Sequence, residues 1–356
     1  MLTRRAPYLQ PLFDGPLDVV GDVHGELDAL RSLMHVLGYD EEGRHPDGRH
    51  LVFVGDLCDR GPDSPGVVAL VRRMIEGGRA QAVLGNHELN LLREARKHGN
   101  GWFYDHDHDR AAGEFGDSRP IEAGEGARTL AFLRELPVAL ARDDLRVVHA
   151  VWDDASLARL GGELAGWTPD RVHRDDPGPA ELRAAIAELE AERRLEMARY
   201  GERLRQRDEG VPLLEAVGRS DALWQRGNPM RVVTSGLEQL AARPYFAGGA
   251  WRMTDRVRWW DEYDHETPVV FGHYWRWVDP QSRGAYSKGE PDLFTGAAPN
   301  AWVGRQRNAF CTDFSAGARY KERELGAVAP WQTSLAAVRW PERELVLDDG
   351  TRLPLV

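Results

Sequence analysis

Short apolar runs and segments of helical periodicity alternate along the first 150 residues. β-Branched and aromatic runs that end in glycine predict strands at 17–21, 50–55 and 82–85. Apolar positions three and four residues apart, such as Leu27, Leu30 and Met34, mark the helices that follow, which we predict at 26–37, 64–75 and 88–97. Three successive strand–helix units are typical of an α/β protein whose mostly parallel sheet is covered by helices.

The pattern of apolar and charged residues between 151 and 264 differs from that of the first 150 residues. Residues 181–208 are dense in glutamate, arginine and alanine, with apolar side chains roughly on one stripe, which predicts a long amphipathic helix. We interpret 151–264 as a largely helical insertion or cap. A strand pattern precedes it at 145–150 and returns after it at 268–272, 309–314, 334–340 and 344–347. We therefore expect one domain assembled from residues 15–150 and 265–350, with the insertion between them.

Composition places the chain among soluble globular proteins. Its 356 residues are 42% hydrophobic and 29% charged, and 57 acidic against 46 basic residues give a net charge of −11. That balance repels phosphate backbones and so disfavours nucleic acid as a partner. Cys58 and Cys311 are too few for a disulfide framework or a cysteine-based zinc site. The sequence shows neither a membrane-length apolar run nor a secretory leader, so we expect a cytoplasmic protein with no membrane partner.

Each of the first three predicted strands ends in side chains that bind metals. The loops read Gly21-Asp22-Val23-His24-Gly25, Gly55-Asp56-Leu57-Cys58-Asp59-Arg60-Gly61 and Gly85-Asn86-His87-Glu88. Because the carboxyl ends of neighbouring strands open into one crevice, we expect these side chains to converge. Two more histidines follow later predicted strands. The candidate metal ligands are Asp22, His24, Asp56, Asn86, His149 and His273.

Carboxylate, amide and imidazole donors together suit manganese, iron or zinc better than calcium. Six such ligands are enough for two ions that share one carboxylate, which is a known device for displacement at phosphorus. Each motif taken singly also has an ordinary structural explanation, because an Asp-x-His after a strand is commonly a helix cap or a loop contact. Their occurrence after three consecutive strands favours the metal site.

Together these motifs, in this order and about 30 residues apart, resemble those of the calcineurin-like metallophosphoesterase superfamily. The similarity is close over residues 17–98 and extends to His149 and His273 as single positions. Asp59, Arg60 and Glu88 are similar to its phosphoprotein-phosphatase branch, which also contains bacterial symmetrical dinucleoside tetraphosphatases. The resemblance implies a metallophosphoesterase sandwich of two β-sheets flanked by helices. It also implies hydrolysis of a phosphate ester by a hydroxide that bridges two metals.

The resemblance assigns the six candidate ligands to two cations, with manganese expected first and iron or zinc as alternatives. The first metal would be bound by Asp22 and His24, and Asp56 would bridge both. The second would be completed by Asn86, His149 and His273.

The remaining motif residues would serve catalysis and substrate binding. The resemblance implies that His87 protonates the leaving oxygen and that Asp59 orients it, since a histidine needs a carboxylate to stay protonated and aimed. Arg60 would bind phosphoryl oxygens, which its guanidinium fork matches, and Asn86 would assist in substrate binding.

One departure narrows the choice among branches. Many diesterases of the superfamily have a second histidine two residues after the last ligand, whereas here Trp275 follows His273 at that spacing. That difference fits the phosphoprotein-phosphatase branch and argues against cyclic-nucleotide diesterases and nucleases.

The substrate is the open question. We expect a phosphorylated partner, first a phosphoserine or phosphothreonine protein, then a dinucleoside polyphosphate, and third a nucleotide or nucleic-acid end. A metal-binding scaffold without catalysis is the non-enzymatic alternative, and the paired His87 and Asp59 argue against it, because metal storage does not need them. The oligomeric state is left open.

Some features have two interpretations. His106 and His108 form either an additional metal site or a polar loop. The late tryptophans either stack on a nucleobase or fill the core, and we favour the core. Asp313 follows a late strand and is interpreted as structural, near the site. Candidates for a second phosphate-binding arginine are Arg226, Arg252, Arg256 and Arg258.

Overall fold

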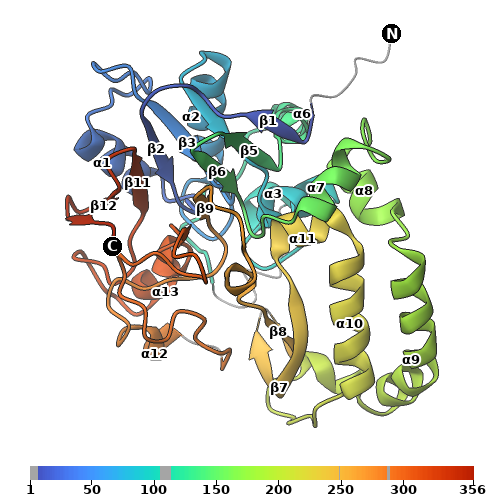
Figure 1. Cartoon of the computed structure of the whole chain (residues 1–356). Helices are drawn as coiled ribbons and strands as arrows, with labels where there is room; N and C mark the ends of the chain where they lie inside the picture. Colours follow the sequence, from blue (N-terminus) through green and yellow to red (C-terminus); the bar gives the residue numbers. More distant parts are fainter. Residues whose placement is uncertain (1–6, 105–113, 248, 287–288) are drawn as a thin grey trace.

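The protein is described by a computed structural model that covers residues 7–104, 114–247, 249–286 and 289–356. Two main sheets, of six and five strands, form the body of the molecule, and a helical region with a two-stranded hairpin extends from it (Figure 1). This arrangement confirms the predicted α/β sandwich with a helical insertion. No helix within the described ranges is both long and apolar enough to cross a membrane.

The six-stranded sheet contains the first three predicted strands. Its order is β13-β12-β11-β2-β3-β4. The parallel strands are β2 (Leu17–Val20), β3 (His50–Phe53) and β4 (Ala80–Ala82), and the antiparallel ones are β11 (Ala336–Trp340), β12 (Glu344–Leu347) and β13 (Arg352–Pro354). In register, Val20 faces Phe53 and Phe53 faces Ala82, so the three parallel strands end level with one another.

The five-stranded sheet has the order β1-β5-β6-β9-β10. Its strands are β1 (Leu9–Pro11), β5 (Ala139–Arg142), β6 (Leu145–Val148), β9 (Val269–Phe271) and β10 (Ala309–Cys311). The last three run parallel, while β5 and β6 form an antiparallel pair. The five-stranded sheet is thus mostly parallel, as predicted, whereas the six-stranded sheet is mixed because β11, β12 and β13 pair in antiparallel fashion.

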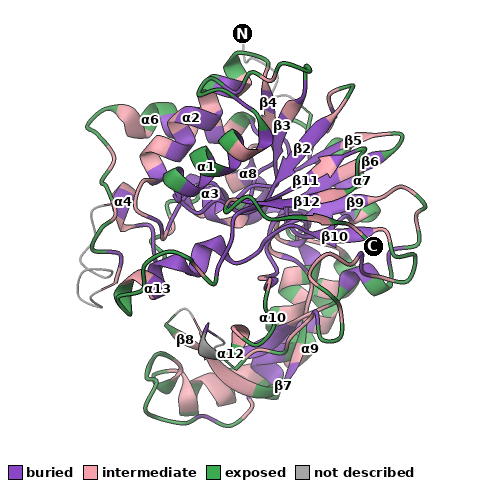
Figure 2. Cartoon of the chain, turned by 90° about the vertical axis from the view of Figure 1, so that its left-hand side faces the viewer, coloured by how far each residue is buried: buried purple, intermediate pink, exposed green. Residues whose placement is uncertain are grey.

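The two sheets pack face to face through alternating side chains. Leu17, Val19 and Val52 point from one sheet into a buried cluster that also holds Val147 and Phe310 of the other. Alternation puts successive side chains on opposite faces, so one set fills the space between the sheets and the other meets the helices. Figure 2 shows this buried interior of strands, with exposed surface on the outer helices and loops.

Helices cover the outer face of the six-stranded sheet. They include α1 (Leu27–Leu37), α2 (Ser64–Glu76), α3 (Asn86–Leu92), α4 (Gly101–Tyr104) and α6 (Glu125–Glu135). Helix α1 ends at Gly38, whose φ of 98° is a left-handed conformation that glycine adopts without strain. Helix α2 begins after Asp63, whose carboxylate accepts the backbone N–H of Gly66.

Two boundaries differ from the prediction. The third strand is β4 at 80–82 rather than 82–85, because residues 83–85 already form the loop toward the site. The third helix is α3 at 86–92 rather than 88–97. It starts earlier because the Glu88 side chain accepts the N–H of Gly85, and it ends where Glu94 turns to a left-handed φ of 56°.

The segment 151–264 is built from helices and one hairpin. Its elements are α7 (Asp154–Gly161), α8 (Pro169–Asp175), α9 (Ala180–Tyr200), η1 (Arg203–Arg205), α10 (Glu215–Gly227), α11 (Pro229–Ser235), β7 (Glu238–Ala247), β8 (Ala250–Arg256) and η2 (Trp259–Asp261). The long helix predicted at 181–208 ends at Tyr200. Met197, Tyr200 and Leu204 of its predicted stripe pack on a small separate core that includes Met253 of β8.

The C-terminal part adds three short helical elements around the strands. They are α12 (Arg283–Tyr286), η3 (Ala316–Ala318) and α13 (Arg319–Glu324). The predicted strands at 268–272, 309–314 and 334–340 appear as the shorter β9, β10 and β11, because their last or first residues belong to loops.

A buried ion network holds the amino end of β2, away from the strand ends that carry the metal-ligand motifs. Asp18, with no exposed surface, accepts hydrogen bonds from Arg49 at 2.9 Å, Arg339 at 2.9 Å and the Tyr39 hydroxyl at 2.7 Å. Glu342 accepts a second bond from Arg49 at 2.7 Å. One carboxylate thus ties β2 to the residue before β3 and to β11.

We predict that Asp18→Asn destabilises the fold by about 3–5 kcal/mol, because it leaves buried guanidinium groups without their charge partner. Urea unfolding measures the loss. The exposed Asp208→Asn serves as the control and should change the free energy of unfolding by less than about 0.5 kcal/mol. Equal stability of the two variants would contradict this role for Asp18.

Candidate metal centre and active site

The site is formed by the loops that follow β2, β3, β4, β6 and β9. Five of the predicted site residues lie there with left-handed backbone, namely His24 (φ 48°), Asp56 (48°), Asp59 (74°), Arg60 (73°) and His273 (71°). Such conformations cost of order 1–3 kcal/mol each in residues other than glycine and gather at functional sites. The concentration of these backbone conformations in the loops indicates a functional site.

Glycines let these loops approach one another closely. A Cβ on Gly272 would lie 2.0 Å from Asp22 Oδ1, and one on Gly317 would lie 2.2 Å from His24 Cδ2. Neither position can hold a larger residue without displacing a predicted ligand. Gly317 belongs to η3, so the turn after β10 also closes over the site.

The first group of converging side chains surrounds His24. Its Nε2 lies 3.7 Å from Asp56 Oδ2 and 4.0 Å from Asp22 Oδ2. His87 Nε2 lies 3.9 Å from the same Asp56 oxygen. The donor atoms of His24, Asp56 and His87 all lie within 4.8 Å of one another, a spacing at which they could hold one metal ion.

The second group shares Asp56. Donor atoms of Asp56, His149 and His273 lie within 4.8 Å of one another. Asn86 Oδ1 lies 3.2 Å from His149 Nε2, and the backbone N–H of His273 donates to Asp22 Oδ2 at 3.1 Å. The structure therefore brings all six predicted ligands into one buried cluster, with Asp56 between the two groups.

The donor atoms of this cluster fit divalent cations. His149 Nδ1 donates to the Val54 carbonyl oxygen at 2.7 Å, so the lone pair of the neutral ring lies on Nε2. That lone pair faces Asn86 Oδ1 at 3.2 Å and Asp56 Oδ1 at 3.4 Å. His273 Nε2 is buried with no hydrogen-bond partner among the described residues. Electron-rich atoms that face one another in this way are stabilised by a cation between them.

Electrostatics support the same conclusion. Burial raises the pKa of Asp22, and the nearby charges of Asp313 and Asp56 raise it further. Burial lowers the pKa of His24 and of His273. For His149 burial works against the proton, but the Asp56 carboxylate outweighs it and raises the pKa. Crowded carboxylates in a buried site, and imidazoles such as His24 and His273 whose burial disfavours the proton, would be stabilised by bound divalent cations.

His87 and Arg60 lie beside the shared carboxylate. His87 Nδ1 is 2.6 Å from Asp59 Oδ2, and Asp59 Oδ1 accepts the indole N–H of Trp102 at 2.6 Å. The Arg60 guanidinium donates to His24 Nε2 and to His87 Nε2, each at 3.0 Å, and lies over the Trp275 ring at 5.1 Å. A cation on His24 would take that lone pair and free the guanidinium for an anion.

Glu88 organises the loop around Asp56, a role that the sequence did not reveal. Its buried carboxylate accepts the backbone N–H groups of Asp56 at 2.9 Å, Leu57 at 2.8 Å and Gly85 at 3.0 Å. The Cys58 thiol also donates to it at 3.2 Å. Burial raises the pKa of this thiol, so Cys58 is an inert part of the loop rather than a reactive group.

Asp313 lies nearer the site than a purely structural residue would need to. Its carboxylate accepts the backbone N–H of Trp275 and of Ser315, each at 2.9 Å. It thereby joins the loop that carries His273 to the turn that covers His24. Its only sequence signal is its place directly after a late strand.

The candidate arginines and the late tryptophans lie partly near the site and partly in the core. Among the candidate arginines, Arg256 donates to the His273 carbonyl oxygen at 2.8 Å, while Arg258 pairs with Asp261. Of the late tryptophans, four are buried in the core and two are half-buried, which agrees with the preferred interpretation; the buried ones are Trp259, Trp260, Trp277 and Trp302. His106 and His108 lie outside the described residues.

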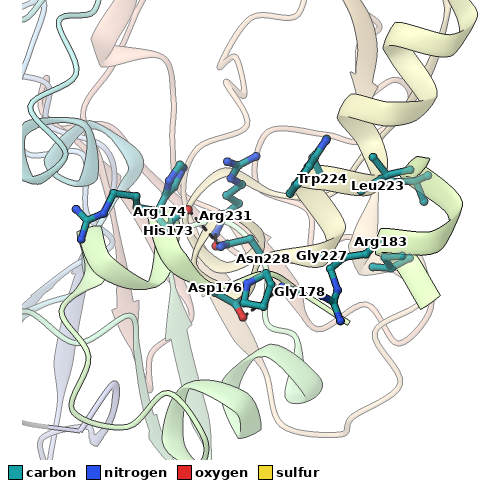
Figure 3. Close-up of a pocket in the computed structure, with 13 residues that line it drawn as sticks. His173, Arg174, Asp176, Gly178, Arg183, Leu223, Trp224, Gly227, Asn228 and Arg231 are labelled. Atoms are coloured by element: carbon teal, nitrogen blue, oxygen red, sulfur yellow. Dashed lines mark hydrogen bonds between the residues drawn. The ribbon is translucent and has the colours of Figure 1, made fainter. Parts of the chain in front are cut away.

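Two surface hollows lie apart from this cluster. One, shown in Figure 3, is formed by residues of α8, α9, α10 and α11, among them His173, Asp176, Trp224 and Arg231. The other lies beside Arg142 and Glu342, near the ion network of Asp18. Neither contains a predicted ligand.

Comparison with known proteins gives one family. Residues 15–188 match the model of the calcineurin-like phosphoesterases. An asymmetrical bis(5′-nucleosyl)-tetraphosphatase of Halalkalibacterium halodurans is 51% identical over 79 residues, which are 21% of this chain and 32% of that protein. Another, of Bacillus velezensis, is 37% identical over 139 residues, 37% of this chain and 55% of that protein.

A symmetrical bis(5′-nucleosyl)-tetraphosphatase of Ralstonia nicotianae is 32% identical over 156 residues. These are 42% of this chain and 48% of that protein. The matches thus span between about a third and about half of the length of these three relatives.

The residues matched by the family model include four of the five strand ends on which the converging side chains lie. His273, beyond the matched residues, completes the cluster from β9. The shared sequence and the two-sheet fold point the same way, and residues 15–188 of the chain are similar to the calcineurin-like phosphoesterases.

Proposed function

We propose that the protein hydrolyses phosphoric esters and anhydrides with two divalent cations, and that its substrate is a dinucleoside polyphosphate. The observation that carries the proposal is the Asp56 carboxylate between His24 on one side and His149 and His273 on the other, with the His87–Asp59 pair and Arg60 beside it. A metal-holding scaffold would not need the second set of three residues.

In this proposal Asp22, His24 and Asp56 hold one cation, and Asp56, Asn86, His149 and His273 hold the other. Manganese is the expected metal, with iron and zinc as alternatives that the same donors accept. When bound, two such cations neutralise phosphoryl charge and lower the pKa of water.

The chain's own groups act on the phosphate and on the leaving group. The Arg60 guanidinium turns from the histidines to two phosphoryl oxygens, which its planar fork fits. His87 gives a proton from Nε2 to the departing oxygen. Asp59 accepts the Nδ1–H of His87 and stabilises the doubly protonated ring that carries the Nε2 proton, while Trp102 fixes the second oxygen of Asp59.

The choice of substrate follows the relatives. We considered a phosphoserine or phosphothreonine protein first, but the three relatives described above are named as dinucleoside tetraphosphatases. The half-buried Trp275 ring beside Arg60 offers a flat apolar surface that suits a nucleoside better than a flexible peptide. We therefore place the dinucleoside polyphosphate ahead of the phosphoprotein.

The role of His87 predicts a selective loss of activity. His87→Asn should slow the hydrolysis of phenyl phosphate, whose leaving group needs a proton, by roughly 10²–10⁴-fold. With p-nitrophenyl phosphate, whose leaving group needs little protonation, the loss should be much smaller. Steady-state kinetics on both esters provide the measurement. Equal losses on the two esters would exclude His87 as the general acid.

The metal content of variants distinguishes His87, the proposed general acid, from the proposed metal ligands. Elemental analysis of the manganese-loaded protein should find about two ions in the natural chain and in His87→Asn. His273→Ala removes one ligand of the second cation, and we expect it to keep about one ion. If His87→Asn loses an ion while His273→Ala does not, the assignment of the two histidines is wrong.

Removal of the metals should strongly reduce turnover. Treatment with a chelator followed by desalting should lower the hydrolysis of p-nitrophenyl phosphate at least about 10²-fold, and added Mn²⁺ should restore it. A stripped protein that keeps its full rate would end the proposal of metal-dependent hydrolysis.

A substrate panel tests the proposed class. We expect kcat/KM for diadenosine tetraphosphate to exceed that for a phosphoserine peptide by at least about tenfold, because the second nucleotide adds binding contacts. A 2′,3′-cyclic nucleotide should react slowest. The products identify the cleaved bond, since two ADP indicate symmetrical cleavage, and ATP with AMP indicates asymmetrical cleavage. Turnover of the phosphopeptide alone would reverse the choice.

A further inference from the structure

A group of cations without ion-pair partners lies where the segment after α3 meets the region 151–264. None of the five has a carboxylate within ion-pair distance in the part of the chain that the structure describes. They come from the segment after α3, from η1, from α11 and from β8, and they are Arg93, Lys97, Arg205, Arg231 and Arg252. We name these five residues the basic cluster. It stands out in a chain with a net charge of −11.

Packing of the insertion against the body brings the cluster together. Helix α3 packs on α8 and α11, which puts Arg93, just past the end of α3, near Arg231 of α11. Strand β8 packs on η1, where the Trp251 indole donates to the Gln206 carbonyl oxygen at 3.0 Å, and this contact places Arg252 near Arg205. Lys97 is close enough to Arg93, Arg205 and Arg252 for their charges to act on it.

Mutual repulsion within the cluster is visible in the pKa values. Burial lowers the pKa of Lys97, and Arg252, Arg93 and Arg205 lower it further. Burial also lowers the pKa of Arg93, with Arg231 adding to the effect. The acids that act on Arg231 are Asp221 and Glu238, which face it from α10 and β7.

The pKa of His173 in α8 is affected by two of the same positive charges. Burial lowers its pKa to about 3, and Arg93 and Arg231 contribute to that shift. Figure 3 shows the side chains of His173 and Arg231 on the same side of their helices. The unbonded Arg231 Nε is buried, so this guanidinium has unused donor capacity.

The segment that carries Lys97 contacts Arg60 through its backbone. The backbone N–H of Arg60 donates to the Gly99 carbonyl oxygen at 3.0 Å, and Lys97 precedes Gly99 by two residues. The Lys97 backbone is therefore within about 7 Å of that contact. Asn100 Oδ1 accepts the Lys97 N–H at 2.9 Å and fixes this turn. An anion held by Arg60 thus has further cations along the chain of contacts that leads outward.

We propose that the basic cluster binds the phosphates of a polyphosphate substrate that lie beyond the one being hydrolysed. This inference rests on the proposed function and specifies its substrate as an extended polyanion. Holding like charges together costs free energy, and a bound chain of phosphates offsets that cost. A phosphopeptide carries one phosphate, which Arg60 and the cations already engage, and so it has nothing to place there.

The test removes the two members of the cluster on the segment after α3, with Arg93→Gln/Lys97→Gln as the variant. The matched control is Arg31→Gln/Arg73→Gln, two exposed arginines on α1 and α2. The probe is inorganic tripolyphosphate, and calorimetry on metal-stripped protein gives its Kd without chelation or turnover. We expect the Kd to rise at least about tenfold in the variant and less than about twofold in the control, with the difference shrinking at high salt.

Kinetics on the manganese-loaded protein complete the test. In the cluster variant, KM for diadenosine tetraphosphate should rise about tenfold, while kcat/KM for p-nitrophenyl phosphate should stay within about threefold of the natural chain. If the natural chain hydrolyses neither compound, the proposed function fails on its own. An unchanged tripolyphosphate Kd in the cluster variant, or an equal rise in the control, overturns the inference. A loss confined to phosphopeptide turnover would also overturn it.

Discussion

The position of the Asp56 carboxylate is the constraint on which the rest of the site depends. Its two oxygens face His24 and His87 on one side and His149 on the other, at 3.4–3.9 Å, while the backbone N–H of His87 donates to Oδ1 at 2.9 Å. An oxygen surrounded by imidazoles in a buried crevice has little water to stabilise its charge. Bound cations would neutralise the charge of this carboxylate. The geometry around Asp56 therefore supports a metal site.

That geometry is maintained from outside the crevice. Glu88 holds the loop that carries Asp56 through three backbone N–H groups, and Asp313 joins the loop of His273 to the turn above His24. Left-handed residues in these loops carry conformational strain, and the buried network of Asp18 supports the strands from the opposite end. The ion network at the start of β2 thus stabilises the strand whose other end carries the strained loop of His24.

The sequence predicted the convergence at the site well because one rule governs it. Side chains such as Asp22, Asp56 and Asn86 directly follow strands, and the ends of parallel strands meet at one edge of a sheet whatever the loops between them do. The two-sheet sandwich came from the family resemblance, because a strand pattern alone does not say which strands share a sheet.

Other parts could not be predicted for physical reasons. The hairpin of β7 and β8 has few buried positions, so it lacks the apolar alternation that marks a strand. Helix α3 stops before Glu94 although helix-favouring residues such as Ala95 and Lys97 follow, because the chain turns left-handed there. The role of Glu88 was hidden, since a glutamate in a first helical turn is ordinary, and only tertiary contacts show that it organises the Asp56 loop.

The distribution of charge links the insertion to the site. A surface with a net charge of −11 repels anionic substrates at long range, and the excess of acid would slow their encounter with the crevice. Lys97 comes from the segment after α3, whereas Arg205 and Arg252, whose charges act on it, come from the region 151–264. In the proposed function, that region therefore adds to the positive charge that an approaching polyanion meets.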